Sequence, residues 1–253
     1  MQHSSRKSQT FPSIAKLLQS HLQCALSHVF LETLTTAELG NHTHAFMLQQ
    51  EKNSLKYRSA IALAVARNQS DLAPEIAKQL TEWLQGQISP DFAQIQHLPP
   101  ASIEFTLGEG AIQQWLSDGL SCICEFSGKQ IASFPEYVRD RCWQLLRLGI
   151  EENIIAPCAT QWKDLSWFRS SILQAPDWEF LYHLIASSDR LENVSSTQQR
   201  QKLAHRLSTA FLAFHRQCQL FNRQQLHFPE ISKIRLALIA ITQEIIISLM
   251  FPP

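Results

Sequence analysis

Residues 199–223 read QRQKLAHRLSTAFLAFHRQCQLFNR, with apolar side chains at every third or fourth position. These side chains are Leu203, Leu207, Ala210, Phe214, Cys218 and Phe221, and Phe211 broadens the row. Such spacing places them on one face of an α-helix. The segment is therefore predicted to be a helix that packs against a core.

A second stripe of the same predicted helix carries four cations and no acid. It runs through Lys202, Arg206, Thr209, Ala213, Arg216, Leu220 and Arg223. A helix that is packed on one side and basic beside it can lay the basic side along a phosphate backbone. Periodicity alone leaves a second interpretation open, in which this is a solvated face that happens to be basic.

Length and composition indicate a globular, helix-rich chain. Of 253 residues 45% are apolar, with 11 prolines and 7 glycines, which allows one large domain or two modest ones. The formal net charge is zero, which argues against a protein that binds nucleic acid through overall charge. No apolar run is long enough to span a membrane. Residues 1–10 lack the apolar segment of a signal peptide, so we expect a disordered tail there and a cytoplasmic location.

Sequence signatures of catalysis and of cofactor binding are absent. Without a G-x-G-x-x-G or P-loop motif, a nucleotide has no predicted seat. The six cysteines form no C-x-x-C pair, and several take apolar helical positions, which is typical of small core residues in a reducing compartment. His42 and His44 fall in a loop-like segment and are interpreted as polar loop residues rather than metal ligands. We predict a non-enzyme with no cofactor and no metal.

The first half of the chain mixes helical and strand-like patterns. Helices are predicted over residues 11–31, 55–67, 72–85 and 111–126, and strands over 45–50, 92–96 and 102–107. Pro12 and Ser13 mark the start of the first helix. Helices that cover a small antiparallel sheet make an α+β domain. That domain is predicted over 11–126, followed by a polar linker over 127–133.

Residues 134–253 are predicted to form an all-α bundle. Besides 199–223, helices are expected from Phe134, over 165–173, over 178–187 with Asp177 as the cap, and over 229–250. The last segment is apolar nearly all round, so it is predicted to be buried in the bundle or in a partner. The predicted fold class is therefore mainly α, with a small α+β N-terminal domain followed by a helical bundle.

Two motifs in the second half resemble a known family. The run Ala210-Phe211-x-x-Phe214-x-x-x-Cys218-x-Leu220 is similar to A-F-x-x-F-Y-x-x-C-x-V in the anticodon-binding (DALR-type) domain of arginyl-tRNA synthetases. Downstream, Arg235-Leu236-Ala237-Leu238-Ile239-Ala240-Ile241-Thr242 resembles that domain's R-L-A-L-V-x-A-T helix. The resemblance implies a DALR-type bundle over residues 134–253.

The first half resembles the additional N-terminal domain of the same family. Its pieces are Tyr57-x-x-Ala60-Ile61-Ala62-Leu63-Ala64, Glu75-Ile76-Ala77 and Pro100-x-x-Ile103-Glu104-Phe105-x-Leu107. In the family this domain reaches the elbow of the tRNA. Here Ala60 and Glu104 replace asparagines of the family pattern, and an acid in place of an amide would repel phosphate.

The resemblance omits the catalytic domain that lies between these two parts in the family. Neither of its ATP-handling motifs, H-x-G-H and K-M-S-K-S, is present. The predicted function is therefore a non-catalytic tRNA-binding protein derived from an arginyl-tRNA synthetase, with arginine tRNA as the first candidate ligand.

Candidate contacts to tRNA follow from the basic stripe and from the family motifs. Phosphate is assigned to Lys202, Arg206, Arg216 and Arg223, with Arg139, Arg141, Arg147 and Arg235 as second contributors, and base stacking to Tyr57 or His215. The plainer interpretation is that Arg141 and Arg147 pair with nearby acids and that Tyr57 lies at a core edge.

The alternative function is a protein-interaction or regulatory module that keeps the folds and has lost tRNA binding. Removing the catalytic domain would expose surfaces that attract a protein partner. The sequence ends at Phe251-Pro252-Pro253, where the family continues, and Gln243 replaces an arginine of the family pattern. Both differences favour this alternative, and the oligomeric state stays open.

Overall fold

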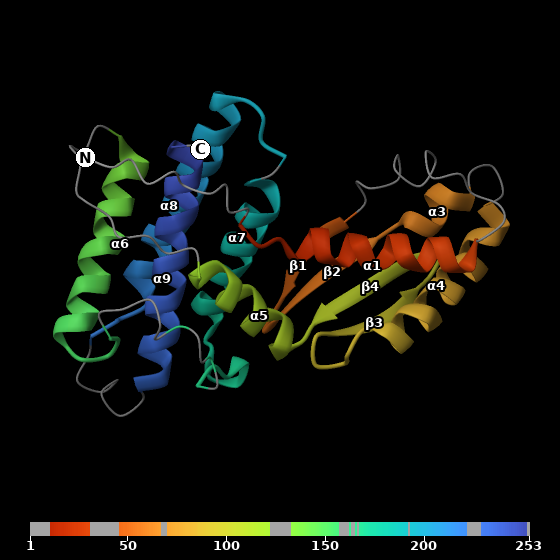
Figure 1. The fold of residues 1–253 in the computed structure, drawn as a ribbon, viewed down its shortest axis with the longest axis horizontal. Helices are drawn as coiled ribbons and strands as arrows, with labels where there is room; N and C mark the ends of the chain where they lie inside the picture. Colours follow the sequence, from red (N-terminus) through yellow and green to blue (C-terminus); the bar gives the residue numbers. More distant parts are fainter. Residues whose placement is uncertain are drawn as a thin grey trace. The chain divides into compact units, whose positions relative to one another are not determined.

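The computed structural model describes residues 11–30, 46–66, 70–121, 133–156, 162, 165, 167–191, 193–221 and 229–251. The chain divides into two compact units, coloured along the sequence in Figure 1. We call Ser13–Ile112 the sheet unit, and the part from Gln113 onward, together with Phe11 and Pro12, the helical unit. The predicted tail, His42, His44 and Arg223, and all of the predicted linker except Ser133, lie outside the described residues.

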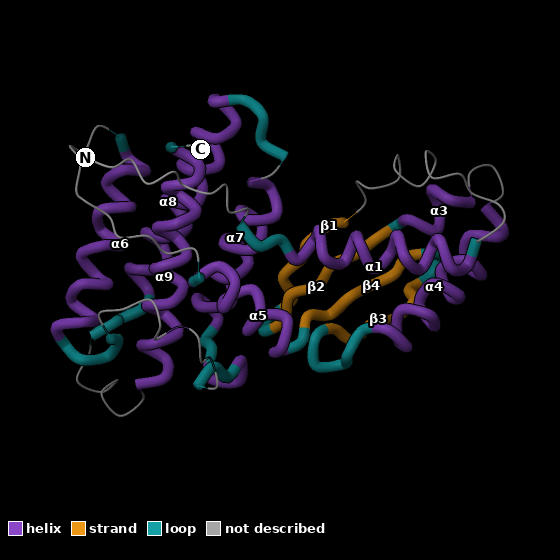
Figure 2. Tube along the Cα trace, in the orientation of Figure 1, coloured by secondary structure: helices purple, strands orange, loops and turns teal. Residues whose placement is uncertain are grey.

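The sheet unit is built on four antiparallel strands in the order β1-β2-β4-β3 (Figure 2). The strands are β1 (Phe46–Glu51), β2 (Ser54–Ser59), β3 (Ala93–Leu98) and β4 (Ser102–Leu107). Tyr57 lies opposite Phe105, which lies opposite Ile95, so one row of buried side chains crosses the sheet. The strands predicted over 45–50, 92–96 and 102–107 are confirmed, apart from one or two residues at their ends.

Helices of the sheet unit bury that row. They are α1 (Ile14–Val29), α3 (Ile61–Ala66) and α4 (Ala73–Gln87), with a 3-10 turn, η1 (Ser70–Leu72), before α4. α4 packs on β3 and β4, α3 packs on β4, and α1 packs on α4. The hydroxyl of Ser13 accepts the Lys16 N–H at 3.2 Å, which confirms the predicted start of α1.

The helix predicted over 55–67 is wrong in its first half, which is strand β2. Leu55, Tyr57 and Ser59 are buried, whereas Lys56 and Arg58 between them are not, and this period of two belongs to a strand. β2 pairs with β1 on one side and with β4 on the other. Pairing with β4 overrides the local helix propensity of this segment. The prediction failed because β4 lies far away in the sequence, so a local pattern does not reveal the pairing.

The helical unit packs around its last helix. Its helices are α5 (Glu109–Leu120), α6 (Phe134–Glu151), α7 (Ala175–Leu191), α8 (Thr197–Gln217) and α9 (Pro229–Met250). α9 packs against α6, α7 and α8 and is buried on nearly all sides, as predicted (Figure 1). The division between the units falls at Ile112, within α5, whereas the sequence places the end of the first domain at residue 126.

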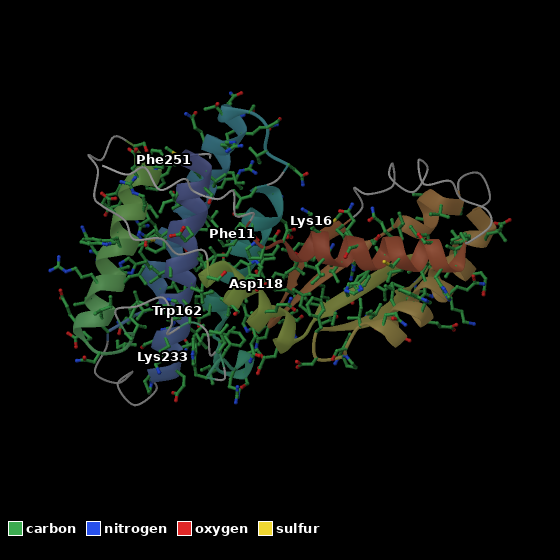
Figure 3. The ribbon with its side chains drawn as sticks, in the orientation of Figure 1. Phe11, Lys16, Asp118, Trp162, Lys233 and Phe251 are labelled. Atoms are coloured by element: carbon green, nitrogen blue, oxygen red, sulfur yellow. The ribbon has the colours of Figure 1, made fainter. Side chains whose placement is uncertain are left out.

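Phe11 belongs to the helical unit although it precedes α1 in the sequence. Phe11 is labelled in Figure 3. Its ring lies edge-on to the Trp115 ring of α5, with centroids 6.4 Å apart. Trp115 in turn donates from its indole N–H to the hydroxyl of Ser188 at 3.1 Å, which fixes α5 against α7. Phe11 therefore contributes to the core of the helical unit.

Two expectations for the bundle are corrected. The helix predicted over 165–173 is no α-helix in its described part, where only the 3-10 turn η3 (Ser170–Ile172) is present. Asp177 is not the cap of α7 but its third residue, and its carboxylate accepts the Gln174 N–H at 2.8 Å. An acid at this position satisfies a donor ahead of the helix and so also marks a helix start.

The fold is mainly helical with a small antiparallel sheet, as the sequence predicts. The sheet has four strands in the described residues, where three were predicted. The assignment of the bundle to the DALR type stays a prediction. Among the described cysteines, Cys142 and Cys218 are core residues as expected, whereas Cys24 is exposed. None of the helices within the described ranges has both the length and the apolar character needed to cross a membrane.

Candidate nucleic-acid interface

α8 is a 21-residue helix that carries arginines, a lysine and histidines but no acid. It begins after Ser196, whose hydroxyl accepts the Gln199 N–H at 3.2 Å. It ends at Gln217, and Cys218 donates its N–H back to Phe214 at 2.8 Å. His215 and Arg216 in the last turn lie where the helix dipole favours positive charge.

The predicted apolar row packs α8 into the bundle. Leu203, Leu207, Phe211 and Phe214 are buried, and Ala210 is half-buried. Cys218 is buried and Phe221 half-buried, but both lie beyond the end of the helix, which is shorter than predicted.

The predicted basic stripe lies on the side of α8 that faces away from this core. Lys202, Arg206, Thr209, Ala213 and Arg216 are all exposed. In the part of the chain that the structure describes, none of the three cations forms an ion pair. We call Lys202, Arg206 and Arg216 the α8 cations. The placement of Leu220 in the stripe is wrong, because Leu220 lies after the end of α8 and is buried. Arg223 lies outside the described residues.

A groove of about 500 Å³ runs between α7 and α8, beside the basic stripe. Its base is apolar, with the Phe180 and Phe214 rings stacked at a centroid distance of 4.3 Å and an angle of 13°. Arg206, Thr209 and Ala213 of the stripe also line the groove. The groove thus combines an aromatic base with a cationic border.

α7 supplies the opposite wall of the groove. Tyr182, His183 and Arg190 line it, and Arg190 forms no ion pair with any described residue. Burial lowers the pKa of His183, against a smaller opposing effect of the nearby Glu179 carboxylate. Sequence reasoning missed these three residues. Their spacing over about two helical turns of α7 could have suggested a common surface. It does not show which face of α7 packs against α8.

α6 borders α8 on its other side. Arg141 places a terminal nitrogen 3.4 Å from Nε2 of His215, so two predicted contributors from different helices meet. Phe134 and His205 also meet across α6 and α8, with ring centroids 4.9 Å apart. Arg147, by contrast, bonds Glu151 at 2.9 Å on its own helix, as the plainer interpretation expects.

Three of the predicted contact residues are buried and are removed from the interface. Tyr57 lies in the sheet core, where its ring meets Phe46 edge-on. Arg139 is fully buried and contacts Asp140 at 2.7 Å. Arg235 is buried between α7 and α9. These three side chains point into the protein and cannot reach an external phosphate.

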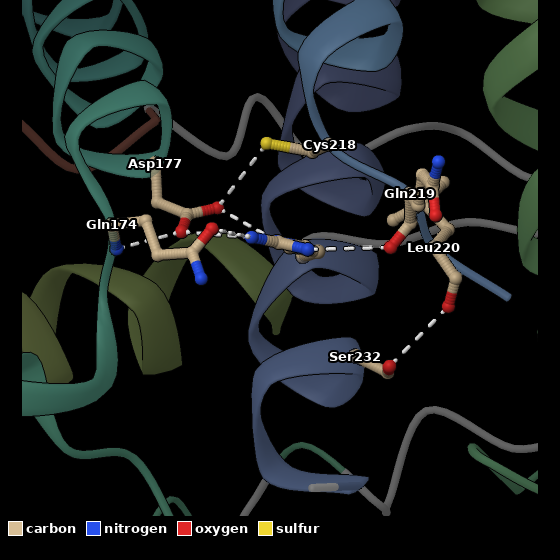
Figure 4. A network of polar contacts seen from close by, with 7 residues as sticks. Gln174, Asp177, Cys218, Gln219, Leu220 and Ser232 are labelled. Atoms are coloured by element: carbon tan, nitrogen blue, oxygen red, sulfur yellow. Dashed lines mark hydrogen bonds and ion pairs between the residues drawn. The ribbon is translucent and has the colours of Figure 1, made fainter. Parts of the chain in front are cut away.

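Arg235 organises a buried polar network instead (Figure 4). Its guanidinium bonds both carboxylate oxygens of Asp177, at 2.8 and 3.2 Å, and the side-chain oxygen of Gln174 at 3.0 Å. It also donates to the Gln219 carbonyl at 3.3 Å, which ties the end of α8 to α7 and α9. Burial, with the adjacent Asp177 charge, raises the pKa of the Cys218 thiol to about 12, so this cysteine is a neutral core residue.

Glu104 is the acid that the sequence analysis expects to repel phosphate, but the structure shows it neutralised by its neighbours. It is 1% exposed on β4, where Arg58 donates to it at 2.7 Å, Gln96 at 2.7 Å and Lys56 lies at 3.1 Å. Burial alone would raise the pKa of Glu104, but these hydrogen bonds outweigh it and hold the pKa below its usual range. The acid is therefore neutralised within the sheet unit, and it occupies the two nearest cations of that unit.

Within the described residues, no three His, Cys, Asp or Glu side chains are grouped closely enough to hold a metal ion. Comparisons of the chain with protein-family models, with curated proteins and with solved structures gave no match.

Proposed function

We propose that this protein is a non-catalytic RNA-binding protein that holds a phosphate backbone against α8, with tRNA as the first candidate. The observation that carries the proposal is the set of α8 cations, which are exposed and unpaired within the described residues on a helix without acids. Acids three or four positions from a cation stabilise a solvated helix through ion pairs, and α8 has no acid.

The dimensions of α8 suit a nucleic-acid strand. Lys202 and Arg216 are separated by about 21 Å along the helix axis, from a rise of 1.5 Å per residue. A single face of this length can follow several consecutive phosphates. Thr209 and Ala213 between the cations are small, so the strand can approach the helix closely.

The groove beside the stripe offers a place for an unpaired base. Unpaired bases in RNA loops are bound by stacking on aromatic side chains and by hydrogen bonds to their edges. Tyr182 and His183 on α7 supply an aromatic ring and a titratable polar edge, and Arg190 and Arg206 supply cations. This arrangement supports a single-stranded loop rather than a regular duplex as the bound element.

The origin from an arginyl-tRNA synthetase remains part of this proposal and rests on the sequence motifs. The absence of H-x-G-H and K-M-S-K-S from the sequence supports a role without aminoacylation. Arginine tRNA is therefore the isoacceptor to test first.

The test is binding of the purified protein to total tRNA and to a scrambled RNA of equal length across a salt series. Arg206→Glu with Arg216→Glu should weaken binding by more than tenfold and leave helix content unchanged in circular dichroism. Lys52→Glu with Lys78→Glu makes the same charge change on exposed residues of the sheet unit and serves as the control. Equal weakening by both double variants would reduce the effect to net charge and would contradict a site on α8.

A second candidate function is protein interaction through α6. Tyr137 is 47% exposed and Leu148 is 36% exposed, about three helical turns apart on one side of the helix. Trp143, about a third of a turn around the same helix from Tyr137, is 41% exposed. Native mass spectrometry of the wild type and of a Tyr137→Ser, Trp143→Ser, Leu148→Ser variant tests this candidate. An assembly that dissociates in the variant supports it, and a monomer in both samples counts against it.

A further inference from the structure

Arg141 and His215 form a contact that is unusual for two basic side chains. One terminal nitrogen of Arg141 lies 3.4 Å from His215 Nε2, and the other donates to the Gln144 side-chain oxygen at 3.1 Å. Both residues are half-exposed, so solvent reaches the pair. Neither forms an ion pair with a carboxylate among the described residues.

The contact requires a neutral imidazole. A guanidinium has only donors, so His215 accepts at Nε2 and carries its proton on Nδ1, a buried atom without a hydrogen-bond partner among the described residues. When His215 is protonated, both of its nitrogens become donors, and Nε2 then faces Arg141 with a like charge. Two adjacent donors of the same sign repel each other, and an acceptor of negative charge that bonds both removes this repulsion. With neutral His215, the two side chains therefore bond each other directly. With protonated His215, both offer donors to an anion.

Among the described residues, no carboxylate contributes to the pKa of His215. On α6, the acid next to Arg141 is Asp140, and it bonds Arg139. Burial first, and then the Arg141 charge, lower its pKa, while its own backbone carbonyl acts in the opposite direction. Charged groups on the other helices packed against α8 include Asp177 and Glu179 on α7 and Arg235 and Glu244 on α9. Asp177 bonds Arg235, Glu179 acts on His183, and none of the four contributes to the pKa of His215.

We propose that Arg141 and protonated His215 together bind one oxyanion where α6 and α8 meet. We call this pair of residues the seat. Resting on the function proposed above, the occupant is a backbone phosphate of the bound RNA. The seat lies on the α6 side of α8, apart from the groove on the α7 side. It therefore gives the RNA a contact that the α8 cations do not make, and it couples binding to uptake of a proton.

The first experiment uses the whole protein and sulfate, which keeps its charge over the relevant pH range. The pKa of His215 is measured from its imidazole C–H signals in NMR titrations, in sulfate and in chloride at equal ionic strength. We expect sulfate to raise the pKa of His215 and to leave that of His183 unchanged, since no cation contributes to the lowered pKa of His183. This readout needs no variant. A pKa of His215 that is the same in both salts would overturn the proposal.

Variants locate the effect on Arg141. Arg141→Gln should raise the pKa of His215 in chloride, because the adjacent charge is gone, and should remove the response to sulfate. Arg147→Gln, two turns of α6 away and paired with Glu151, is the matched control and should behave as the wild type. A sulfate response that persists in Arg141→Gln would assign the anion to another site and contradict the proposal.

RNA binding then distinguishes this proposal from the proposed function. At constant ionic strength, the affinity of the wild type for tRNA should rise by up to tenfold per pH unit as the pH falls, for one proton taken up. In His215→Gln, the number of protons taken up when tRNA binds should be smaller by about one. If tRNA binds through the α8 cations with the same pH dependence in His215→Gln, the seat is excluded and the function stands. If sulfate shifts His215 but tRNA does not bind, the seat exists and its occupant is a free anion rather than RNA.

Discussion

The Asp177 carboxylate and the Arg235 guanidinium meet at 2.8 Å, and both side chains are almost completely buried. Asp177→Ala would leave the Arg235 charge without a counter-ion in the core, and would leave the Gln174 N–H without its acceptor. We expect a loss of about 3–5 kcal/mol in the free energy of unfolding, measured by urea denaturation. Replacing both residues, Asp177→Leu with Arg235→Met, should recover part of it.

The surface pair Arg147–Glu151 is the matched control for this prediction. Glu151→Ala should cost at most about 0.5 kcal/mol, because both partners are exposed and screened by water. Similar losses in Asp177→Ala and Glu151→Ala would contradict a structural role for the buried network.

His183 and His215 make stability depend on pH. Burial is the first cause that lowers both pKa values below the ordinary 6.5, and Arg141 adds to the effect on His215. The unfolded chain therefore binds protons that the folded protein does not. Their contribution to stability is complete above pH 6.5 and is lost as the pH falls below it.

Urea midpoints at about pH 7.5 and about pH 5.5 measure this dependence. His183→Gln and His215→Gln should each reduce the difference between the two midpoints. Exposed His205 supplies the control variant His205→Gln. A difference in midpoints that stays the same in all three variants would show that other groups cause it.

At the scale of elements, α6 and α9 are held in close contact by Gly149. A Cβ at this position would lie 2.7 Å from the Cδ1 of Leu236, which is itself buried. Gly149→Ala gains about 1 kcal/mol of helix propensity, but overpacking of a tight core costs about 1–3 kcal/mol. We expect a net destabilisation, measured as the free energy of unfolding of the helical unit.

Gly86 in α4 is the counterpart, since no atom lies within 4 Å of a Cβ placed there. Gly86→Ala should stabilise by about 0.5–1 kcal/mol through propensity alone. If Gly149→Ala stabilised as much as Gly86→Ala, the contact between α6 and α9 would be looser than the structure indicates.

The elements that could be predicted from the sequence are those whose pattern is local. α8 and α9 repeat apolar residues at helical spacing, and β4 alternates Ile103, Phe105 and Leu107, so each carries its own signal. β2 could not be recognised with the same certainty, because its strand identity depends on pairing with β4. The candidate site divides in the same way. The basic stripe is a property of α8 alone, whereas the burial of Arg235 depends on Asp177, 58 residues away.

At the scale of the whole molecule, Lys56 and Arg58 of the sheet unit differ from the α8 cations in whether they are ion-paired. The net charge is zero, so affinity for RNA cannot come from a general positive field. In the sheet unit, Lys56 and Arg58 are occupied by Glu104. On α8, by contrast, three cations are exposed and unpaired within the described residues. Binding should therefore depend on salt as a small, countable set of phosphate contacts rather than as a large charged surface.

Three phosphate contacts predict the steepness of that dependence. The logarithm of the binding constant should fall with the logarithm of salt concentration with a slope of about −2 to −3, from 0.7–0.9 per phosphate. Between 50 mM and 200 mM salt this is a loss of roughly twenty- to fortyfold in affinity.

Arg206→Gln should reduce the slope by about one contact, and Lys56→Gln should leave it unchanged because Lys56 is already neutralised by Glu104 and Glu51. A slope that Lys56→Gln lowers as much as Arg206→Gln would place the RNA on the sheet unit as well. A slope near zero would mean that the α8 cations do not contact phosphate, and the exposed side chains of α6 would then be the surface to test.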